Sequence, residues 1–385
     1  MKAGLYFDNA ATTYPKPEDV YQAMDETARW MGVNAGRGGY ETARQASQLI
    51  EDTRALVLQY IKAQANAQVV FTASATLAMN LVIGGMEWKN SDVVYVSPFE
   101  HNAVARTLYA YQKKFGFTIL ELPINEDRLQ LDLNQIQYAF TKNPPDYVFM
   151  SHVSNVTGYI LEMEEVGSLA HEKGAKVILD ASQSCGLLPI DIRNGMIDIV
   201  VFAGHKTMYG PFGIGGYVNH TGVSLQPLLY GGTGTDSLNL NMPQGISGLE
   251  PGSPNIVAIS GLRAGLLYLK EHTQLEQKER ELTQYLVSCM EHMPYVHLYL
   301  PSDRSRHISM VAFNIEGYKS EEVGMILDQD YGIAVRTGYH CAPFIHKYLK
   351  DKESLGVVRA SIGCFTTKED VDALVEAVKE IAEEG

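Results

Sequence analysis

The chain has 385 residues, which suits one large and one smaller domain, and its formal net charge is −14. An acidic chain is a poor candidate for binding nucleic acid or an anionic membrane surface, and no stretch approaches the roughly 18 apolar residues of a membrane span. The cysteines are widely spaced, which argues against a disulfide framework or a metal site and favours the reducing cytoplasm; they are Cys185, Cys289, Cys341 and Cys364.

Short apolar runs alternate with helical patterns between residues 68 and 218. The runs are Val69–Phe71, Val93–Val96, Ile119–Leu122, Tyr147–Met150, Val177–Leu179, Ile199–Phe202 and Gly215–Val218. Such alternation is typical of βα units, in which each strand is followed by a helix that covers the sheet. The pattern therefore predicts an α/β fold with a mainly parallel, doubly wound, seven-stranded sheet.

The C-terminal third has a different pattern. Helices are predicted from Ala258 to about His272 and over Leu275–Met293, before Pro294, and Ile308–Ile315 reads as a strand. Ser320 is expected to cap a further helix.

The last helix is expected to begin with Thr366 and Glu369 at the spacing of a capping box. We therefore expect a large domain of residues 15–257. A smaller α+β domain would combine residues 1–14 with residues 258–385.

A lysine and an acid follow two consecutive strand patterns. Lys206 comes after the run that ends at Phe202, and Asp180 follows Leu179. In an open α/β sheet, ligands bind at the carboxyl ends of the strands. An enzyme that uses pyridoxal phosphate needs a lysine for the Schiff base and a carboxylate beside the pyridinium nitrogen. A single lysine after a strand is usually a surface residue, but this paired spacing favours a cofactor site.

Two other positions have chemistry that can be judged from the residues alone. Ser74-Ala75-Thr76 separates a strand from a helix, and a helix N-terminus attracts phosphate, although an ordinary helix cap is the alternative. Arg359 lies in an apolar strand pattern, and a buried arginine needs a partner. A substrate carboxylate would serve, and an internal acid is the alternative.

Nine segments occur in the order found in one known family. They begin at Tyr6, Thr72, Glu100, His152, Asp180, Gly204, Pro251, Arg336 and Val358. The chain resembles, over nearly its whole length, the class V aminotransferase group of fold-type I pyridoxal-phosphate enzymes, which contains cysteine desulfurases and selenocysteine lyases.

The resemblance implies roles for individual residues. The catalytic residues would be Lys206, Cys341 and His101, with His101 stacked on the cofactor ring. The residues implied to bind pyridoxal 5'-phosphate are Ala75, Thr76, His101, Asn155, Asp180, Gln183, His205, Lys206 and Ser253. The residues implied to bind substrate are Asn9, Ala10, Asn155 and Arg359.

Cys341 narrows the function. A cysteine is most often a core residue, but this one lies in a turn between Arg336 and Arg359, where positive charge favours a thiolate. The resemblance implies that it takes sulfur from L-cysteine as a persulfide and that L-alanine is formed after Lys206 removes the Cα proton. The short connection from Cys341 to Arg359 resembles the loop type with a less exposed thiol.

The resemblance also implies a homodimer that shares its sites through residues 231–234 and Ser253. A sulfur-acceptor protein and a role in iron–sulfur cluster assembly are implied as well. Two departures from the family pattern have effects that the sequence does not define: Ala203 replaces a serine or threonine, and residues 34–40 lack a histidine.

Three alternatives stay open. The substrate could be L-selenocysteine, or the enzyme could be a C–S lyase or transaminase in which Cys341 is incidental. The chain could also be a non-enzymatic member that retains the fold.

Overall fold

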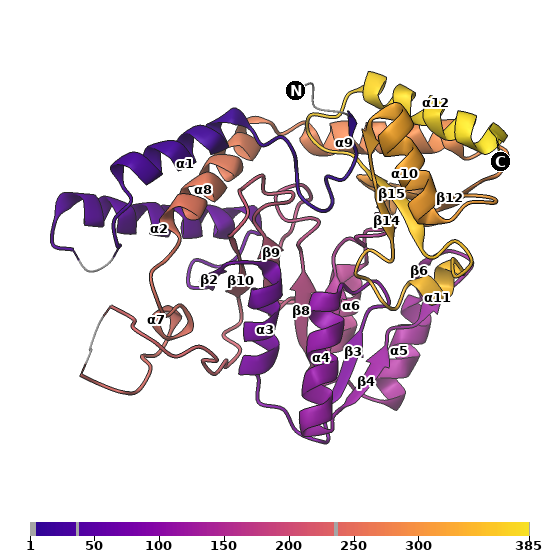
Figure 1. Ribbon diagram of the computed structural model, residues 1–385. Coiled ribbons are helices and arrows are strands. Elements are labelled where there is room, and N and C mark those ends of the chain that lie inside the picture. The colour runs from indigo at the N-terminus through magenta and orange to yellow at the C-terminus, as the bar shows by residue number, and fades with distance from the viewer. Residues whose placement is uncertain (1–4, 36–37, 235–237, 385) are drawn as a thin grey trace.

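A seven-stranded sheet forms the centre of the computed structural model, which describes residues 5–35, 38–234 and 238–384 (Figure 1). In order across the sheet, the strands are β2 (Gln68–Thr72), β10 (Gly215–Asn219), β9 (Ile199–Ala203), β8 (Lys176–Asp180), β7 (Tyr147–Ser151), β3 (Val93–Val96) and β4 (Thr118–Glu121). All neighbours are parallel except that β10 runs antiparallel to β2 and β9. The predicted mainly parallel sheet is confirmed.

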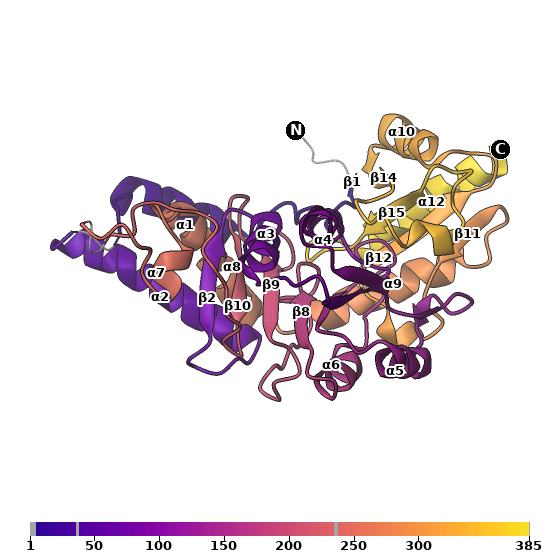
Figure 2. The ribbon, with the colours of Figure 1, turned by 90° about the horizontal axis from the view of Figure 1, so that it is seen from below.

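Helices cover both faces of this sheet. Figure 2 shows α3 (Ala75–Gly85) and α4 (Asn102–Phe115) on one face, with α5 (Leu133–Lys142) and α6 (Met163–His171) on the other. Because both faces are covered, the central strands are buried on both sides and read as continuous apolar runs rather than as alternating ones.

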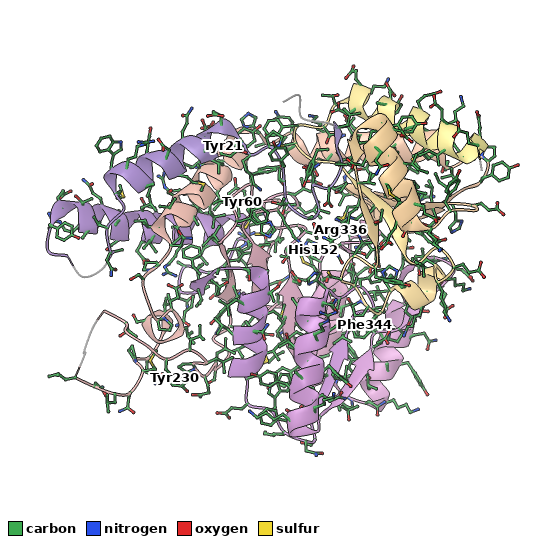
Figure 3. The ribbon with its side chains drawn as sticks, viewed as in Figure 1. Tyr21, Tyr60, His152, Tyr230, Arg336 and Phe344 are labelled. Atoms are coloured by element: carbon green, nitrogen blue, oxygen red, sulfur yellow. The ribbon has the colours of Figure 1, made fainter. Side chains whose placement is uncertain are left out.

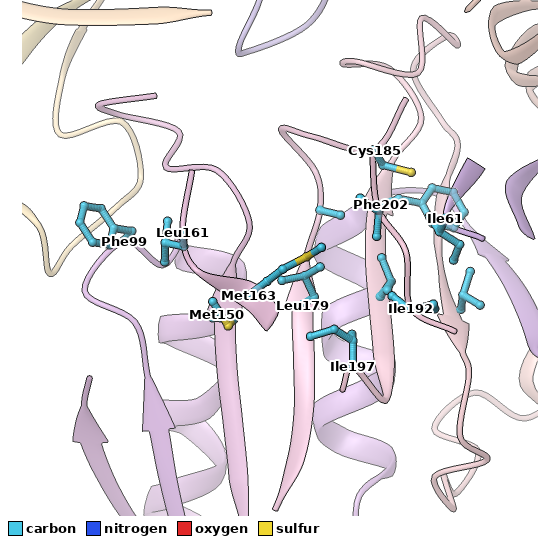
Figure 4. Close-up of a cluster of buried hydrophobic side chains, with 14 of the residues drawn as sticks. Ile61, Phe99, Met150, Leu161, Met163, Leu179, Cys185, Ile192, Ile197 and Phe202 are labelled. Carbon is cyan, nitrogen blue, oxygen red and sulfur yellow. The ribbon is translucent and has the colours of Figure 1, made fainter. Parts of the chain in front are cut away.

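The largest hydrophobic core among the described residues centres on this sheet and extends to Ala312 and Val357 of the C-terminal part. Figure 4 shows part of it, where Met150 and Leu179 from the strands meet Leu161, Met163 and Ile197. Cys185 belongs to the same core and Cys364 is also buried, which agrees with the packing role expected of both.

A second, four-stranded sheet organises the C-terminal part. Its order is β11 (Val296–Tyr299), β12 (Met310–Ile315), β15 (Val357–Ser361) and β14 (Arg336–Gly338), and all its pairs are antiparallel. The helices of this part are α9 (Leu275–Met290), α10 (Ser320–Tyr331), α11 (His346–Leu349) and α12 (Lys368–Glu384), with a 3₁₀ turn at Arg304–Arg306. Figure 1 shows this part above and beside the large sheet.

The N-terminal segment joins the small sheet region before the chain enters the large domain. Strand β1 (Leu5–Tyr6) pairs with β13 (Ile333–Ala334), and Phe7 O accepts from Ser361 N at 2.7 Å. A further short hairpin pairs β5 (Ile124–Asn125) with β6 (Gln130–Leu131).

Three helices form a layer at one end of the large sheet: α1 (Glu18–Trp30), α2 (Glu41–Tyr60) and α8 (Ile256–Glu271), with the short α7 (Ile246–Leu249) below them. Helix α8 packs on α1 and α2, and its buried side chains belong to the large core. The division at residue 257 stays a prediction, and this packing favours a boundary after α8.

Two predicted helix starts need correction. Ser320 is the first residue of α10 rather than its cap, and Glu322 instead accepts from Lys319 N at 2.8 Å. The capping box of α12 lies one residue later than predicted: Thr367 Oγ1 accepts from Asp370 N at 3.2 Å, and Asp370 Oδ2 accepts from Thr367 N at 2.9 Å. Thr366 is unavailable because its hydroxyl accepts from Gly363 N.

We predict that Thr367→Ala destabilises the protein by about 0.5–2 kcal/mol, because the substitution removes a helix cap. Urea unfolding would measure the loss. Thr367→Ser keeps the hydroxyl and should lose much less, so equal losses in the two variants would contradict the assigned cap.

Candidate functional site

A cavity of about 270 Å³ lies at the carboxyl ends of β7, β8 and β9, where the large sheet meets the small domain. Eleven of the predicted site residues line it: Ala10, Ala75, Thr76, His101, Asn155, Asp180, Gln183, His205, Lys206, Cys341 and Arg359. These residues come from distant parts of the chain, so the fold brings together most of the site that the sequence predicted.

Lys206 and Asp180 share this cavity. Asp180 is the last residue of β8, and its Oδ1 accepts from Ser182 N at 2.9 Å, which fixes the carboxylate. Burial lowers the pKa of Lys206 to about 8, and the Asp180 carboxylate opposes that shift. A lysine in this state can supply a neutral amine near physiological pH.

The N-terminal segment holds the backbone carbonyl groups of His205 and Lys206. The sequence analysis did not predict these contacts. His205 O accepts from Thr13 N at 3.3 Å, Thr12 Oγ1 at 3.0 Å and Lys16 Nζ at 2.5 Å. Thr13 Oγ1 donates to Lys206 O at 3.0 Å. Burial lowers the pKa of Lys16 to about 7. No local pattern could reveal contacts between segments 190 residues apart.

The start of α3 forms one end of the cavity. Ser74 Oγ accepts from Leu77 N at 3.2 Å, which leaves the N–H groups of Ala75 and Thr76 facing outward from the helix start. A Cβ on Gly215 would lie 2.8 Å from Ala75 N, so only glycine lets β10 pass this close to the turn.

His205 lies at the same end of the cavity. Its Nδ1 is buried without a partner among the described residues, and burial, followed by the nearby Lys206, lowers its pKa to about 3. Outward N–H groups, a helix dipole and a polar imidazole fit a phosphate group. Ala203 lines the cavity but has no hydroxyl to offer.

His101 is neutral and has a defined tautomer. As the N-cap of α4, its Nδ1 accepts from Ala103 N at 3.0 Å, so the ring proton sits on Nε2. Burial, followed by the charge of Lys206, lowers the pKa of His101 to about 4.

Asn155 and Gln183 each use one amide donor within the protein. Asn155 Nδ2 donates to His340 O at 2.7 Å, and Gln183 Nε2 donates to Ala10 O at 2.9 Å. Each amide retains a second N–H, so their predicted contacts with the cofactor stay predictions.

Arg359 is fully buried and already has an acidic partner. Its Nη2 lies 2.7 Å from Asp8 Oδ1, its Nη1 donates to Asn155 O at 2.6 Å, and its Nε is buried without a partner in the described structure. The internal acid that the sequence left open is therefore Asp8. Burial nevertheless lowers the pKa of Arg359 to about 10, because one carboxylate does not replace the lost hydration.

Arg336 is a second arginine that lines the cavity. The sequence analysis treated this residue only as a neighbour of Cys341. It is half-buried at the junction of the two domains (Figure 3), and its Nη2 lies 3.6 Å from Cys341 Sγ. No ion pair of Arg336 is found in the described part of the chain. The cavity thus has three cationic side chains and suits an anionic ligand.

Cys341 is exposed, contrary to the expectation of a less exposed thiol. It borders the cavity and also an open surface hollow of about 640 Å³ that Tyr109 and Phe344 help to line. The thiol can therefore be approached from the enclosed site and from solvent.

Two predicted residues lie outside the cavity. Asn9 donates to Tyr6 O at 3.3 Å and to Ser361 O at 3.0 Å, so its amide ties the N-terminal segment to β15. Ser253 accepts from Asn34 Nδ2 at 3.2 Å, in a hollow on the outer side of Thr72. The turn that lacks the family histidine includes residues 36–37, which lie outside the described residues.

Glu100 is a buried acid beneath the site that the sequence analysis left without a role. Its Oε1 accepts from Ser151 N at 2.5 Å and from Ser97 Oγ, and burial raises the pKa of Glu100 to about 8. The carboxyl is thereby kept largely protonated at neutral pH, next to the residue that precedes α4.

Comparisons with known proteins agree with this geometry. A sequence profile of the family described as Aminotransferase class-V matches residues 5–374. The chain is 32% identical to a probable cysteine desulfurase of Pyrococcus abyssi, over 98% of this chain and 94% of that protein. It is also 32% identical to a cysteine desulfurase of Escherichia coli strain K12 / DH10B, over 98% and 93%.

Solved structures give the same result. The apo structure of a cysteine desulfurase from Thermococcus onnurineus NA1 matches with a TM-score of 0.91 and 29% identity, covering 99% of this chain and 95% of that one. The cysteine desulfurase CsdA of Escherichia coli, in an S-sulfonic acid form, matches with a TM-score of 0.86, 29% identity and the same coverage. The fold is therefore that of fold-type I pyridoxal-phosphate enzymes.

Among the described residues, no helix combines the length and the apolar composition needed to cross a bilayer. No group of three or more histidine, cysteine, aspartate or glutamate side chains is arranged to hold a metal ion in that same part of the chain.

We predict that Lys206 of the cofactor-free protein becomes reactive as pH rises through about 8, because burial lowers its pKa and the neutral amine is the nucleophile. Reductive methylation followed by peptide mass spectrometry would give the midpoint. Asp180→Asn removes the charge that opposes the shift, so its midpoint should be lower than that of the wild type. A midpoint near the value of about 10.4 for an ordinary lysine would contradict the assignment.

Proposed function

The chain belongs to the aminotransferase class-V family and to its cysteine desulfurase group, and from this premise we propose that Cys341 accepts the sulfur atom of L-cysteine while L-alanine is formed. The enzyme is thus a cysteine desulfurase. The observation that supports the assigned role of Cys341 is its position: its thiol borders the cavity that contains Lys206 and Asp180 and lies 3.6 Å from Arg336.

The residues present fit pyridoxal 5'-phosphate as the cofactor. Lys206 would hold it covalently, Asp180 would pair with the pyridine nitrogen, and the start of α3 with His205 would bind the phosphate. When bound, the cofactor withdraws electrons from the substrate Cα and so makes the Cα proton removable.

The substrate carboxylate is proposed to bind at the cationic side of the cavity. Arg359 offers its unpartnered Nε, and Arg336 offers a guanidinium without an ion pair in the described structure. Charge-assisted bonds to a carboxylate would orient the substrate so that its Cα faces Lys206. In that arrangement the Asp8 carboxylate either stays bound to Arg359 together with the substrate carboxylate or is displaced by it.

Lys206 and His101 have protonation states that suit proton transfer to and from the substrate. The Lys206 amine, with its lowered pKa, removes the Cα proton near neutral pH. His101 is neutral, and its Nε2 is the atom available to deliver or accept a proton.

Sulfur transfer is balanced within the site. The Cys341 thiolate attacks the substrate sulfur, a bond forms between the two sulfur atoms, and the Cβ–S bond breaks. The electron pair of that bond remains with the alanyl carbon, which is then protonated. Arg336 stabilises the thiolate before attack.

The proposal extends to the partners of the enzyme. An acceptor protein in the cytoplasm would take sulfur from the exposed Cys341 and supply it to iron–sulfur cluster assembly. A homodimer is supported by three large apolar side chains that are left open to solvent: Tyr230 (Figure 3) is 76% exposed, Leu238 97% and Leu240 98%. In that dimer Ser253 would reach the cofactor phosphate of the partner subunit.

We predict that Cys341→Ala lowers alanine release from L-cysteine roughly 10³-fold or more, as expected when a nucleophile is removed. Activity on L-selenocysteine should fall less, because selenium leaves more readily than sulfur. Alanine would be quantified for both substrates, and Cys289→Ala, on the remote helix α9, is the matched control. Undiminished cysteine desulfuration in Cys341→Ala would favour the lyase or transaminase alternatives.

Light scattering should give a mass of about 85 kDa, twice the 42.6 kDa of one chain. Replacing both Leu238 and Leu240 by glutamate should shift the protein toward monomer, because two charges would enter an apolar interface. Leu355→Glu, at a 44% exposed position of the small domain, is the control. A wild-type monomer with full activity would refute the dimer.

A further inference from the structure

We infer that His346, which contacts both Asp351 and the backbone carbonyl of Tyr339, is a positioning residue for the Cys341 thiol. The inference rests on the proposed role of Cys341 as the sulfur acceptor. It assigns a function to two buried residues that the proposed chemistry does not use.

The turn that carries Cys341 has an energetically unfavourable backbone conformation. His340 has φ of +46° and Cys341 has φ of +57°, so two consecutive residues with side chains adopt the left-handed conformation. Such a conformation persists only where the surroundings hold it, and it is most frequent at functional sites. The contacts of this turn should therefore reveal what holds it.

Three successive carbonyl groups of the turn are each held from a different part of the fold. His346 Nε2 lies 2.9 Å from Tyr339 O, Asn155 Nδ2 donates to His340 O at 2.7 Å, and the N–H of Asn102 donates to Cys341 O at 2.6 Å. Asn155 and Asn102 thus hold the second and third carbonyls. The first carbonyl also accepts from Ala342 N at 3.0 Å within the turn, and among the described residues His346 is the only side chain with a recorded bond to it.

The ring of His346 faces acceptors on both sides. Its Nδ1 lies 2.5 Å from Asp351 Oδ2, and its Nε2 lies 2.9 Å from Tyr339 O, so the bond to the carbonyl requires a proton on Nε2. Asp351 is 3% exposed and His346 is 9% exposed, which makes the pair a buried histidine–carboxylate contact. The ring of Tyr339 packs edge-on against that of His346, with centroids 4.9 Å apart.

Other charged groups near the pair have partners or positions of their own. Lys347 binds Glu121 at 2.7 Å. Arg106 and Cys341 border the same surface hollow as His346 but have no recorded bond to it. Among the described residues, Asp351 is therefore the acid in contact with the His346 ring.

The consequence concerns the distance between the thiol and its cation. Without the bond to Tyr339 O, the turn would relax toward a more common backbone conformation, and Cys341 Sγ would leave its place 3.6 Å from Arg336. The cavity, Lys206 and the carboxylate-binding arginines would remain. Loss of His346 should therefore slow sulfur transfer while leaving substrate binding intact.

The test uses His346→Gln and Asp351→Asn in the complete enzyme. The rate constant for alanine formation in a single turnover should fall at least tenfold, with KM changed less than twofold. Alkylation of Cys341 by iodoacetamide, followed by peptide mass spectrometry across pH, should show a shifted profile. His171→Gln, which removes a histidine 3.0 Å from Asp198 in the large domain, should change neither quantity.

Nitrogen-15 NMR of the histidine rings gives a readout independent of folding losses in the variants, and it should show a proton on Nε2 of His346, the atom that faces Tyr339 O. A His346 ring without a proton on Nε2 would overturn the inference. So would an unchanged alkylation profile with an unchanged turnover rate in a folded His346→Gln. A shifted profile in a protein whose wild type forms no alanine would support the inference and refute the proposed function instead.

Discussion

The ion pair between Asp8 and Arg359 is the contact on which the arrangement of the site depends. It joins the N-terminal segment to β15, and the same segment continues to Thr12, Thr13 and Lys16, which hold the backbone around Lys206. The nine residues from Asp8 to Lys16 thus connect the cation proposed to bind the substrate carboxylate with the lysine proposed to bind the cofactor. Because both ends are anchored, small and large domain cannot move apart without breaking this connection.

The site is assembled from charges that are incompletely neutralised. Burial lowers the pKa values of Lys206, Arg359 and Lys16, which means that the fold has brought cations together with too few anions to replace their hydration. A cofactor phosphate and a substrate carboxylate would supply the missing negative charge. The protein therefore gives up some stability in exchange for affinity toward anions, as functional sites commonly do.

The sequence predicted those features that depend on local pattern. The strands of the large sheet fell within one residue of their predicted ends, because a strand buried on both faces is necessarily a continuous apolar run. Lys206 and Asp180 could be located because they follow adjacent strands of that sheet. The predicted cap of α12 was one residue too early, because Thr366 and Thr367 both fit the sequence pattern of a helix cap. Only the bond from Gly363 N to Thr366 distinguishes them.

Features that depend on distant contacts could not be predicted in this way. Asp8 and Arg359 are 351 positions apart, and the partner of Arg359 is evident only once the segment after β1 lies beside β15. Asn9 does not line the cavity, because its amide donates to the backbone carbonyl of Ser361. The sequence did not indicate that His346 and Asp351 form a contact, because a histidine followed five residues later by an acid is common in exposed segments.

The double exposure of Cys341, toward the closed cavity and toward the open hollow, has a kinetic consequence. In the proposed role of Cys341, one sulfur atom would occupy the thiol at a time, so a second substrate molecule would wait until the first sulfur had left on the solvent side. The two halves of the cycle would then alternate without a ternary complex, which is the ping-pong pattern. Throughput would accordingly depend on the supply of the molecule that reaches the outer face of the thiol.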